Sequence, residues 1–228
     1  MNLLCGSFAV VAALMYNDLT LAFWLIVAGI VFDFFDGFVA RLLHSSSVIG
    51  VQLDSLADVI TSGLAPAAVL WQVCLQTEPC WLPEGWKLGY GVFVLAAFSA
   101  LRLAKFNIDE TQTVEFCGLP TPAGSLLCAS LGMLWQQGML ALSSDGVLLI
   151  AVLTSLLLVS PIRMFALKFH GFGWRGNEVR YLFLLASIVL IIILRTYAIP
   201  VIIVLYIVVS AVRWLCMRSG NPDKAPKA

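Results

Sequence analysis

The residues most suggestive of chemistry are four aspartates set within apolar surroundings. Asp33 and Asp36 lie three residues apart near the end of one apolar segment, and Asp54 and Asp58 lie four apart near the start of the next. Residues three or four apart share one face of a helix, so each pair is predicted to project to one side. A carboxylate at membrane depth is costly, and such residues usually mark functional sites.

The short loop between the pairs predicts two antiparallel helices whose acidic faces oppose each other. Converging carboxylates in a low-dielectric site must take up protons or bind cations. Oxygen ligands without His or Cys favour Mg²⁺, Mn²⁺ or Ca²⁺, and two such ions about 3.5–4 Å apart clamp phosphorus during displacement. The spacing leaves open metal-assisted phosphoryl chemistry, proton or Na⁺ coupling in a transporter, and structural pairing with Arg41.

Small residues accompany the aspartates. Gly37 and Ala40 follow the first pair on nearly the same face, while Gly50 and Ser62 extend the four-residue spacing of the second pair in both directions. Residues without bulky side chains let helices, or a ligand, approach closely. The acidic faces are therefore predicted to be narrow and accessible.

The elements that position these residues follow from an unusually apolar composition. Of 228 residues, 61% are hydrophobic and 11% charged, against about 45–50% and about 25% in soluble domains. This excludes an ordinary soluble enzyme, and zero net charge gives no basic footprint for nucleic acid. Because hydrocarbon offers the backbone no partners, we predict an all-α polytopic membrane bundle of about eight transmembrane helices. The expected segments are roughly residues 3–16, 20–43, 48–75, 88–106, 120–143, 146–169, 178–195 and 197–217.

These segments predict a single transmembrane domain over residues 1–217 and a polar tail over 218–228. The first apolar run lacks the basic start and cleavage site of a signal peptide. If alternate loops share a side, only Lys87 and Arg195 of the thirteen basic residues fall on the far side. Basic residues mark the cytoplasmic side, so the acidic site and both termini are predicted to face the cytoplasm. In the outward loop, Cys74 and Cys80 are compatible with either a disulfide or free thiols.

The aspartate pattern resembles the signature of the CDP-alcohol phosphotransferases. It runs Asp-x-x-Asp-Gly-x-x-Ala-Arg, eight residues, then Gly-x-x-x-Asp-x-x-x-Asp, with every fixed position met by Asp33, Asp36, Gly37, Ala40, Arg41, Gly50, Asp54 and Asp58. Four further stretches resemble the integral-membrane members that use CDP-diacylglycerol and serine. They start at Asn2-Leu-Leu-Cys-Gly6, Asp54-Ser-Leu-Ala-Asp58, Leu101-Arg102-Leu-Ala-Lys105 and Gly118-Leu-Pro120.

The resemblance implies a reaction in which CDP-diacylglycerol and L-serine give phosphatidylserine and CMP. It implies Asp58 as general base and two divalent cations, Mg²⁺ or Mn²⁺, held by Asp33, Asp36, Asp54 and Asp58. Nucleotide-binding residues would be Asn2, Gly37, Ala40, Arg41, Gly50, Ser62 and Pro66. Residues binding phosphate or serine would be Arg102, Lys105, Thr121 and Ser125. It further implies a homodimer in the bacterial cytoplasmic (inner) membrane.

Two alternatives remain at this stage. A related phosphotransferase acting on glycerol phosphate or inositol phosphate would call for a larger basic cluster, which Arg102 and Lys105 do not exclude. An ion-coupled transporter would call for broken helices repeated in corresponding halves. No internal repeat is visible, and the four clustered aspartates fall in one quarter of the chain.

Overall fold

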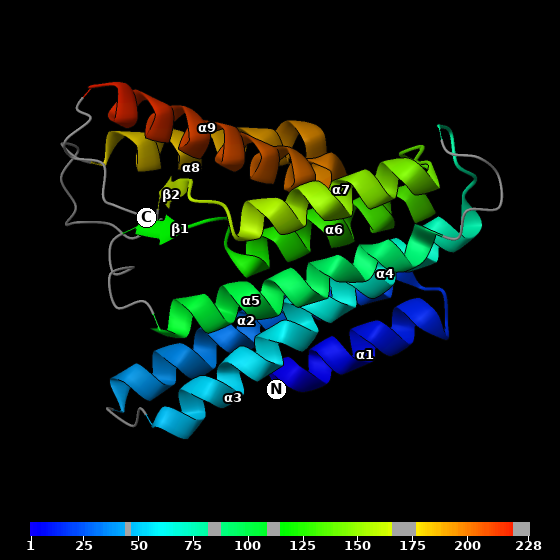
Figure 1. The fold of residues 1–228 in the computed structure, drawn as a ribbon, viewed down its shortest axis with the longest axis horizontal. Helices are drawn as coiled ribbons and strands as arrows, with labels where there is room; N and C mark the ends of the chain where they lie inside the picture. Colours follow the sequence, from blue (N-terminus) through cyan, green and yellow to red (C-terminus); the bar gives the residue numbers. More distant parts are fainter. Residues whose placement is uncertain (44–46, 82–87, 109–114, 166–176, 221–228) are drawn as a thin grey trace.

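The computed structural model describes residues 1–43, 47–81, 88–108, 115–165 and 177–220 (Figure 1). The first half contains α1 (Asn2–Leu14), α2 (Leu19–Leu42), α3 (Val48–Asp58), a π-helical segment η1 (Val59–Leu64), α4 (Ala65–Gln76), a 3₁₀ segment η2 (Leu88–Phe93) and α5 (Val94–Ile108). The second half contains β1 (Glu115–Cys117), α6 (Thr121–Gln136), α7 (Ser144–Leu158), β2 (Arg163–Phe165), α8 (Glu178–Leu194), a 3₁₀ turn η3 (Arg195–Tyr197) and α9 (Ala198–Gly220).

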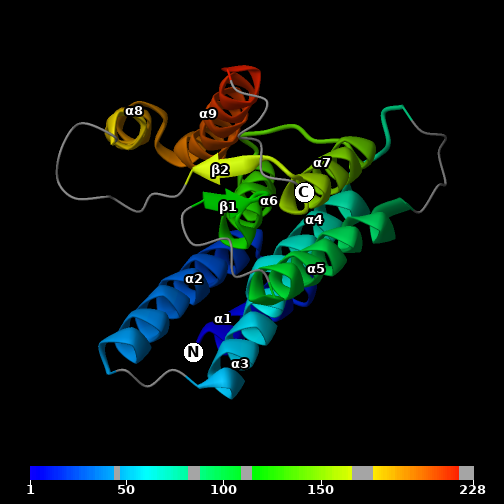
Figure 2. The ribbon, with the colours of Figure 1, turned by 60° about the vertical axis from the view of Figure 1, so that its left-hand side comes forward.

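The long helices lie lengthwise beside one another (Figure 1). Helices α1 to α5 form one side of the molecule, α6 and α7 pack onto them, and α8 and α9 lie on the opposite side of α6 and α7. The core between these layers is built from fully buried apolar side chains such as Phe23, Leu70 and Leu134. This packing brings the end of α2, the start of α3 and the end of α5 to the same end of the molecule (Figure 2).

The helices identify an integral membrane protein. In the part of the chain that the structure describes, four helical stretches are long and apolar enough to cross a membrane: Leu19–Ala40, Ile49–Gln76, Gly89–Ile108 and Glu178–Cys216. The last comprises α8, η3 and α9. Helices Asn2–Leu14 and Ser144–Leu158 are apolar but shorter. The prediction of a helical membrane bundle is thus confirmed in its coarser form, while the number of helices that cross the membrane stays a prediction.

Helix α6 ends earlier than the apolar pattern predicted. The segment expected over 120–143 stops being helical after Gln136. Gly138 follows with a φ of +70°, a left-handed conformation that ends a helix and that glycine adopts at little cost. Apolar residues continue beyond this point, which is why hydrophobicity alone placed the end too late.

The expected helix over 146–169 also ends early, and its last part contains a strand. Helix α7 stops at Leu158, ahead of Pro161, a residue that cannot donate a backbone hydrogen bond to a continuing helix. Strand β2 then pairs antiparallel with β1, with Cys117 opposite Arg163. The all-α prediction is therefore wrong in this detail, because backbone groups between α5 and α6 and after α7 satisfy each other in a two-stranded ladder.

The third helical stretch contains a π-helical turn directly after Asp58. Thr61 in this turn donates its hydroxyl to the Asn2 carbonyl at 3.1 Å. Gly6 of α1 faces the same turn, and a Cβ placed on it would lie 2.8 Å from Thr61 Cα. Only glycine permits this approach, so η1 fixes the start of α1 against the third helical stretch.

At the opposite end, Asp145 in the first turn of α7 holds the segment that follows α4. Its carboxylate accepts hydrogen bonds from the Cys80 amide at 3.1 Å and the Trp81 amide at 2.5 Å. Cys74 and Cys80 are both free thiols. Of the polar tail expected over 218–228, the first three residues complete α9, and residues 221–228 lie outside the described part.

Candidate active site

The start of α1 lies between the two aspartate-bearing helices (Figure 2). The Asn2 side-chain amide nitrogen donates to Asp33 Oδ1 at 3.1 Å and to Asp58 Oδ1 at 2.9 Å. Asn2 itself is buried, with 3% of its surface exposed. One amide thus bridges α2 and α3 and offsets part of the repulsion between their carboxylates.

Three of the four aspartates form one compact group, and Asp58 lies beside it. Asp33, Asp36 and Asp54 each offer a carboxylate oxygen, and these oxygens all lie within 4.8 Å of one another. Asp33 is half-buried, and the other two are exposed. A cluster of carboxylate oxygens from two helices is the donor set that hard divalent cations prefer, so these residues fit a metal of that class. Asp58 was predicted as a further ligand but is not part of this group.

A pocket of about 630 Å³ adjoins the aspartate cluster. Its walls are the first turn of α1, the end of α2 and the start of α3; Asn2, Asp36, Gly37, Ala40, Gly50 and Asp54 are among the residues that line it. A Cβ added to Gly37 would meet nothing within 4 Å, so the space beside it is open. Apolar side chains including Leu3, Leu4 and Leu53 complete the lining.

Two residues predicted to bind the nucleotide, Ser62 and Pro66, do not line this pocket. The prediction for the Arg41 side chain lies outside the described part. Ser62 and Pro66 are buried away from the pocket. The four-residue spacing that connected Ser62 to Asp58 assumed a regular α-helix, whereas the π-helical turn widens the helix there and rotates Ser62 away.

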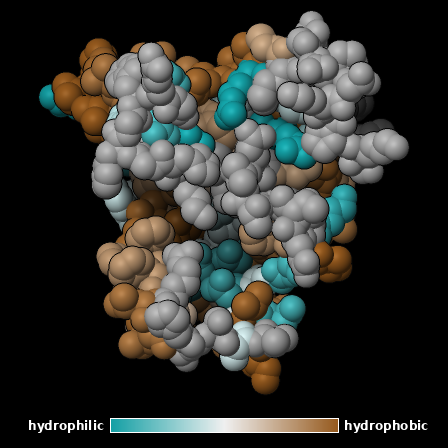
Figure 3. Space-filling model, turned by 90° about the vertical axis from the view of Figure 1, so that its left-hand side faces the viewer, coloured by the Kyte–Doolittle hydropathy of each residue, from teal (hydrophilic) through white to brown (hydrophobic). Residues whose placement is uncertain are grey.

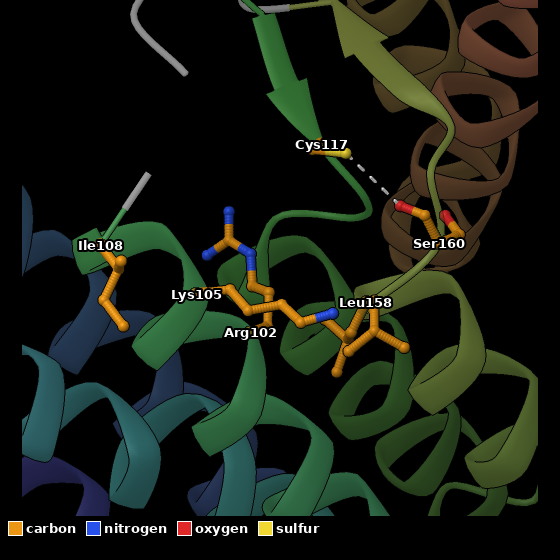
Figure 4. Close-up of a pocket in the computed structure, with 7 residues that line it drawn as sticks. Arg102, Lys105, Ile108, Cys117, Leu158 and Ser160 are labelled. Carbon is orange, nitrogen blue, oxygen red and sulfur yellow. Dashed lines mark hydrogen bonds between the residues drawn. The ribbon is translucent and has the colours of Figure 1, made fainter. Parts of the chain in front are cut away.

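Two predicted acceptor-binding residues line a second pocket, of about 270 Å³. Arg102 and Lys105 extend from α5 into the space between α5, Cys117 at the end of β1, and Leu158 and Ser160 at the end of α7 (Figure 4). Arg102 is buried, with 8% of its surface exposed, and Lys105 is exposed. This pocket places two cationic side chains where a small anionic group would bind.

The other two predicted acceptor residues lie behind that pocket. Thr121 is buried, and its hydroxyl oxygen accepts a hydrogen bond from Arg102 Nη1 at 3.1 Å. Ser125 is buried and donates to the Thr61 carbonyl at 3.4 Å. Both residues therefore hold Arg102 and η1 in place from α6.

Arg102 also connects the second pocket to the aspartates. Its guanidinium interacts electrostatically with the Asp58 carboxylate. The guanidinium carbon lies 5.5 Å from the centre of the Phe106 ring, the geometry of a cation–π contact. Asp58 thus has a neighbour lining each pocket: Asn2 in the larger and Arg102 in the smaller.

Sequence reasoning missed several residues that shape this site. Thr61 anchors Asn2, while Cys117 and Ser160 form walls of the smaller pocket. Thr61 carried one signal, a hydroxyl three residues after Asp58 in an apolar run. The two wall residues lie in short connections whose pairing depends on tertiary structure.

The pockets, the aspartates and the cations lie at one end of the molecule. Seen from that end, hydrophilic surface gathers between hydrophobic flanks (Figure 3). Carboxylates suited to a divalent cation, an adjoining pocket with an apolar part and a small cationic pocket define a membrane-embedded enzyme that acts on an anionic, partly apolar substrate.

Comparison with known proteins narrows this class. Residues 1–160 match the family model described as CDP-alcohol phosphatidyltransferase. Relatives described as CDP-diacylglycerol--serine O-phosphatidyltransferase include one from Bacillus subtilis, 33% identical over 173 residues that cover 75% of this chain and 88% of the relative. Another, from Mycobacterium tuberculosis, is 33% identical over 240 aligned positions that cover 98% of this chain and 81% of the relative. The chain belongs to the CDP-alcohol phosphatidyltransferase family.

Proposed function

We propose that this protein transfers the phosphatidyl group of CDP-diacylglycerol to L-serine and releases CMP. The observation that carries the proposal is the position of Asp58, which contacts Asn2 of the larger pocket and interacts with Arg102 of the smaller one. A base between two pockets suits a reaction that joins two substrates. The names of the relatives supply the identities of the donor and the acceptor.

The larger pocket suits the donor. The open space beside Gly37 accommodates a nucleotide, and the amide groups in the first turn of α1 favour an anion such as pyrophosphate. Leu4 and Leu53 line the same pocket and are exposed, so acyl chains would leave it along apolar surface. Arg41, adjacent in sequence to the pocket residue Ala40, completes the proposed nucleotide-binding set.

Asp33, Asp36 and Asp54 would hold two divalent cations, Mg²⁺ or Mn²⁺. The chemistry that such cations supply when bound is neutralisation of phosphate charge. The oxygen-only cluster supports this assignment, as does its position beside the larger pocket.

Asp58 would act as the general base. It takes the proton of the serine hydroxyl as the serine oxygen forms a bond to the lipid-bearing phosphorus. The bond from that phosphorus to the CMP oxygen breaks, and CMP leaves with the electron pair. The Asn2 amide, which donates to Asp58 at 2.9 Å, orients the carboxylate and stabilises its ionised form.

The smaller pocket would bind serine. Arg102 and Lys105 present cationic groups for the serine carboxylate, and Thr121 holds Arg102 in position. A phosphorylated alcohol would use the same two cations, so the acceptor is decided by the assay below.

For the whole molecule we propose that all eight apolar helical segments cross the bilayer of a bacterial cytoplasmic membrane, with the aspartates and both termini on the cytoplasmic side. The bias of basic residues supports this orientation. The family resemblance implies a homodimer. The many exposed apolar side chains along α2, α8 and α9 are compatible with one.

The test is CMP release by the purified protein with CDP-diacylglycerol and Mn²⁺ or Mg²⁺. Serine, glycerol 3-phosphate and inositol phosphate are supplied separately. We expect CMP only with serine, loss of activity after chelation and recovery when the metal returns. Release only with a phosphorylated alcohol would overturn the serine assignment, and no release with any acceptor would overturn the enzymatic proposal.

A further inference from the structure

The helix pair α8–α9 lies beyond the residues that match the family model, yet one of its side chains is bonded to β2, the strand next to the smaller pocket. We propose that Tyr206 of α9 is a positioning residue that sets the shape of the acceptor pocket through β2. The inference rests on the proposed function, because it assigns the smaller pocket to the acceptor.

Tyr206 is fixed to β2 by a hydrogen bond and by ring packing. Its side chain is buried, and its hydroxyl donates to the Phe165 carbonyl at 3.0 Å. The rings of Tyr206 and Phe165 meet edge to face with centres 4.9 Å apart. The ring of Phe183 in α8 packs against both, with its centre 5.5 Å from that of Phe165 and 5.9 Å from that of Tyr206. Both helices of the pair therefore hold the end of β2.

Strand β2 transmits this position to the pocket wall. Its pairing with β1 places Cys117 opposite Arg163, and the next amide, of Gly118, donates to the Ile162 carbonyl at 2.9 Å. The Cys117 thiol lies 3.8 Å from the Ser160 carbonyl oxygen (Figure 4). Cys117 and Ser160 both line the smaller pocket, so a shift of β2 would move two of its walls.

Gly118 makes this wall intolerant of adjustment. Its φ is +78°, and a Cβ on it would lie 2.9 Å from the carbonyl carbon of Leu158, another lining residue. The chain between β1 and α6 therefore lies directly on the end of α7. Displacing the ladder would have to displace the pocket itself.

Arg102, the buried cation of the smaller pocket, is held by two other elements. Its guanidinium donates to the Thr121 hydroxyl of α6 at 3.1 Å and interacts with the Asp58 carboxylate of α3. Tyr206 therefore acts on the wall of the pocket, whereas α3 and α6 fix its cation.

The decisive variant is Tyr206→Phe, which keeps the ring in the cluster and removes only the hydroxyl. We expect the KM for serine to rise about 3- to 10-fold, the fold-change that corresponds to the net free energy of one hydrogen bond. We expect kcat to stay within about two-fold and the KM for CDP-diacylglycerol to remain unchanged, because other helices line the larger pocket.

Tyr197→Phe is the matched control. Tyr197 directly precedes α9, and its hydroxyl also donates to a backbone carbonyl, that of Met139, at 2.6 Å. This bond lies at the turn between α8 and α9, at the end of the molecule away from the smaller pocket. We expect Tyr197→Phe to leave both KM values unchanged. Equal serine KM values for the two variants, or a joint rise of both KM values in Tyr206→Phe, would overturn the inference.

A second measurement does not depend on turnover. Alkylation of Cys117, followed by mass spectrometry of its peptide, reports the position of the wall directly. We expect a several-fold change of rate in Tyr206→Phe and none in Tyr197→Phe. If the wild-type protein uses another acceptor, the serine assignment fails. The rate of Cys117 alkylation and the KM for that other acceptor then still decide the role of Tyr206. Unchanged alkylation would count against it.

Discussion

At the residue scale, four side chains of one type have different surroundings, and the tasks proposed for them differ accordingly. Three aspartates share a cluster of oxygens, whereas Asp58 lies beside this cluster and accepts from the Asn2 amide. Asn2 spans both sets, since the same nitrogen also donates to Asp33. A single neutral amide therefore keeps the carboxylates of α2 and α3 close in space without adding a charge.

Asp58→Asn tests the division of labour among the aspartates. The change keeps the shape of the side chain but removes the proton acceptor, so we expect kcat to fall about 10²- to 10⁴-fold. Binding of CDP in the presence of Mn²⁺, measured by calorimetry, should be retained. Loss of CDP binding would instead make Asp58 primarily a metal ligand.

Asp18→Asn provides the matched control for that variant. Asp18 accepts from the Leu21 amide at 2.8 Å at the start of α2, the end of that helix remote from the active site. Its replacement should affect stability slightly and leave kcat unchanged.

Asp145, remote from the active site, should make stability depend on pH. Hydrogen bonds from the Ser143 hydroxyl and from three backbone amides lower the pKa of its carboxyl from 3.8 to about 2. Because the folded-state pKa is depressed, its contribution is complete above about pH 4 and is lost as the pH falls through about 2. We expect Asp145→Asn to lower Tm at pH 7, with the difference from wild type shrinking between pH 4 and pH 2. The Tm values are measured by fluorescence in detergent. A constant difference in Tm over that pH range would contradict this assignment.

At the element scale, close packing of α1 on η1 positions the residues of the proposed active site. Thr61 binds the Asn2 carbonyl, Ser125 binds the Thr61 carbonyl, and Gly6 allows the helices to touch. The π-helical turn therefore joins the start of α1 to α6, which also carries the partner of Arg102. One irregular turn fixes the relative position of the two pockets.

Two glycines with opposite surroundings test this arrangement. A Cβ at Gly6 would collide with the Thr61 backbone, so Gly6→Ala should destabilise the protein by about 1–3 kcal/mol. Gly37 faces open space in the larger pocket, so Gly37→Ala should keep Tm at or above that of wild type while raising the KM for CDP-diacylglycerol. Thermal melting and initial rates separate the effects; a lower Tm for Gly37→Ala would contradict the open space.

The sequence predicted the helices well because long apolar runs in a membrane chain have few alternatives to helix. It did not predict the end of α6 at Gly138 or the strands, since these depend on local conformation and on partners distant in sequence. The aspartates were identified from spacing, and Gly37 from its place beside them. The displacement of Ser62 could not be foreseen, because a π-helical turn changes the periodicity on which the prediction depended.

At the scale of the whole molecule, the proposed active site occupies one end, and the Asp145 contact lies at the other. The cationic residues of the smaller pocket and the aspartates share the end predicted to be cytoplasmic. Helices α8 and α9 lie beyond the residues that match the family model, and α9 packs against α6 and β2. The orientation in the membrane therefore decides from which compartment the acceptor enters.

Cysteine labelling tests the orientation. Cys80 and Cys117 are both exposed, and they lie at opposite ends of the molecule. In variants that retain only one of them, a membrane-impermeant maleimide should label Cys80 in right-side-out vesicles and Cys117 only in inside-out vesicles. The reverse pattern would contradict the proposed orientation, and labelling of both thiols from one side would contradict a spanning arrangement of the helices between them.

The apolar lining of the larger pocket has a consequence for how the donor is encountered. Exposed Leu4 and Leu53 lie beside the carboxylates, so the lipid would enter sideways from the bilayer and keep its tails there. Encounters then occur in two dimensions, and saturation depends on the mole fraction of donor among the surrounding amphiphiles. Inert lipid or detergent would slow the reaction by surface dilution even when the amount of donor per litre is unchanged.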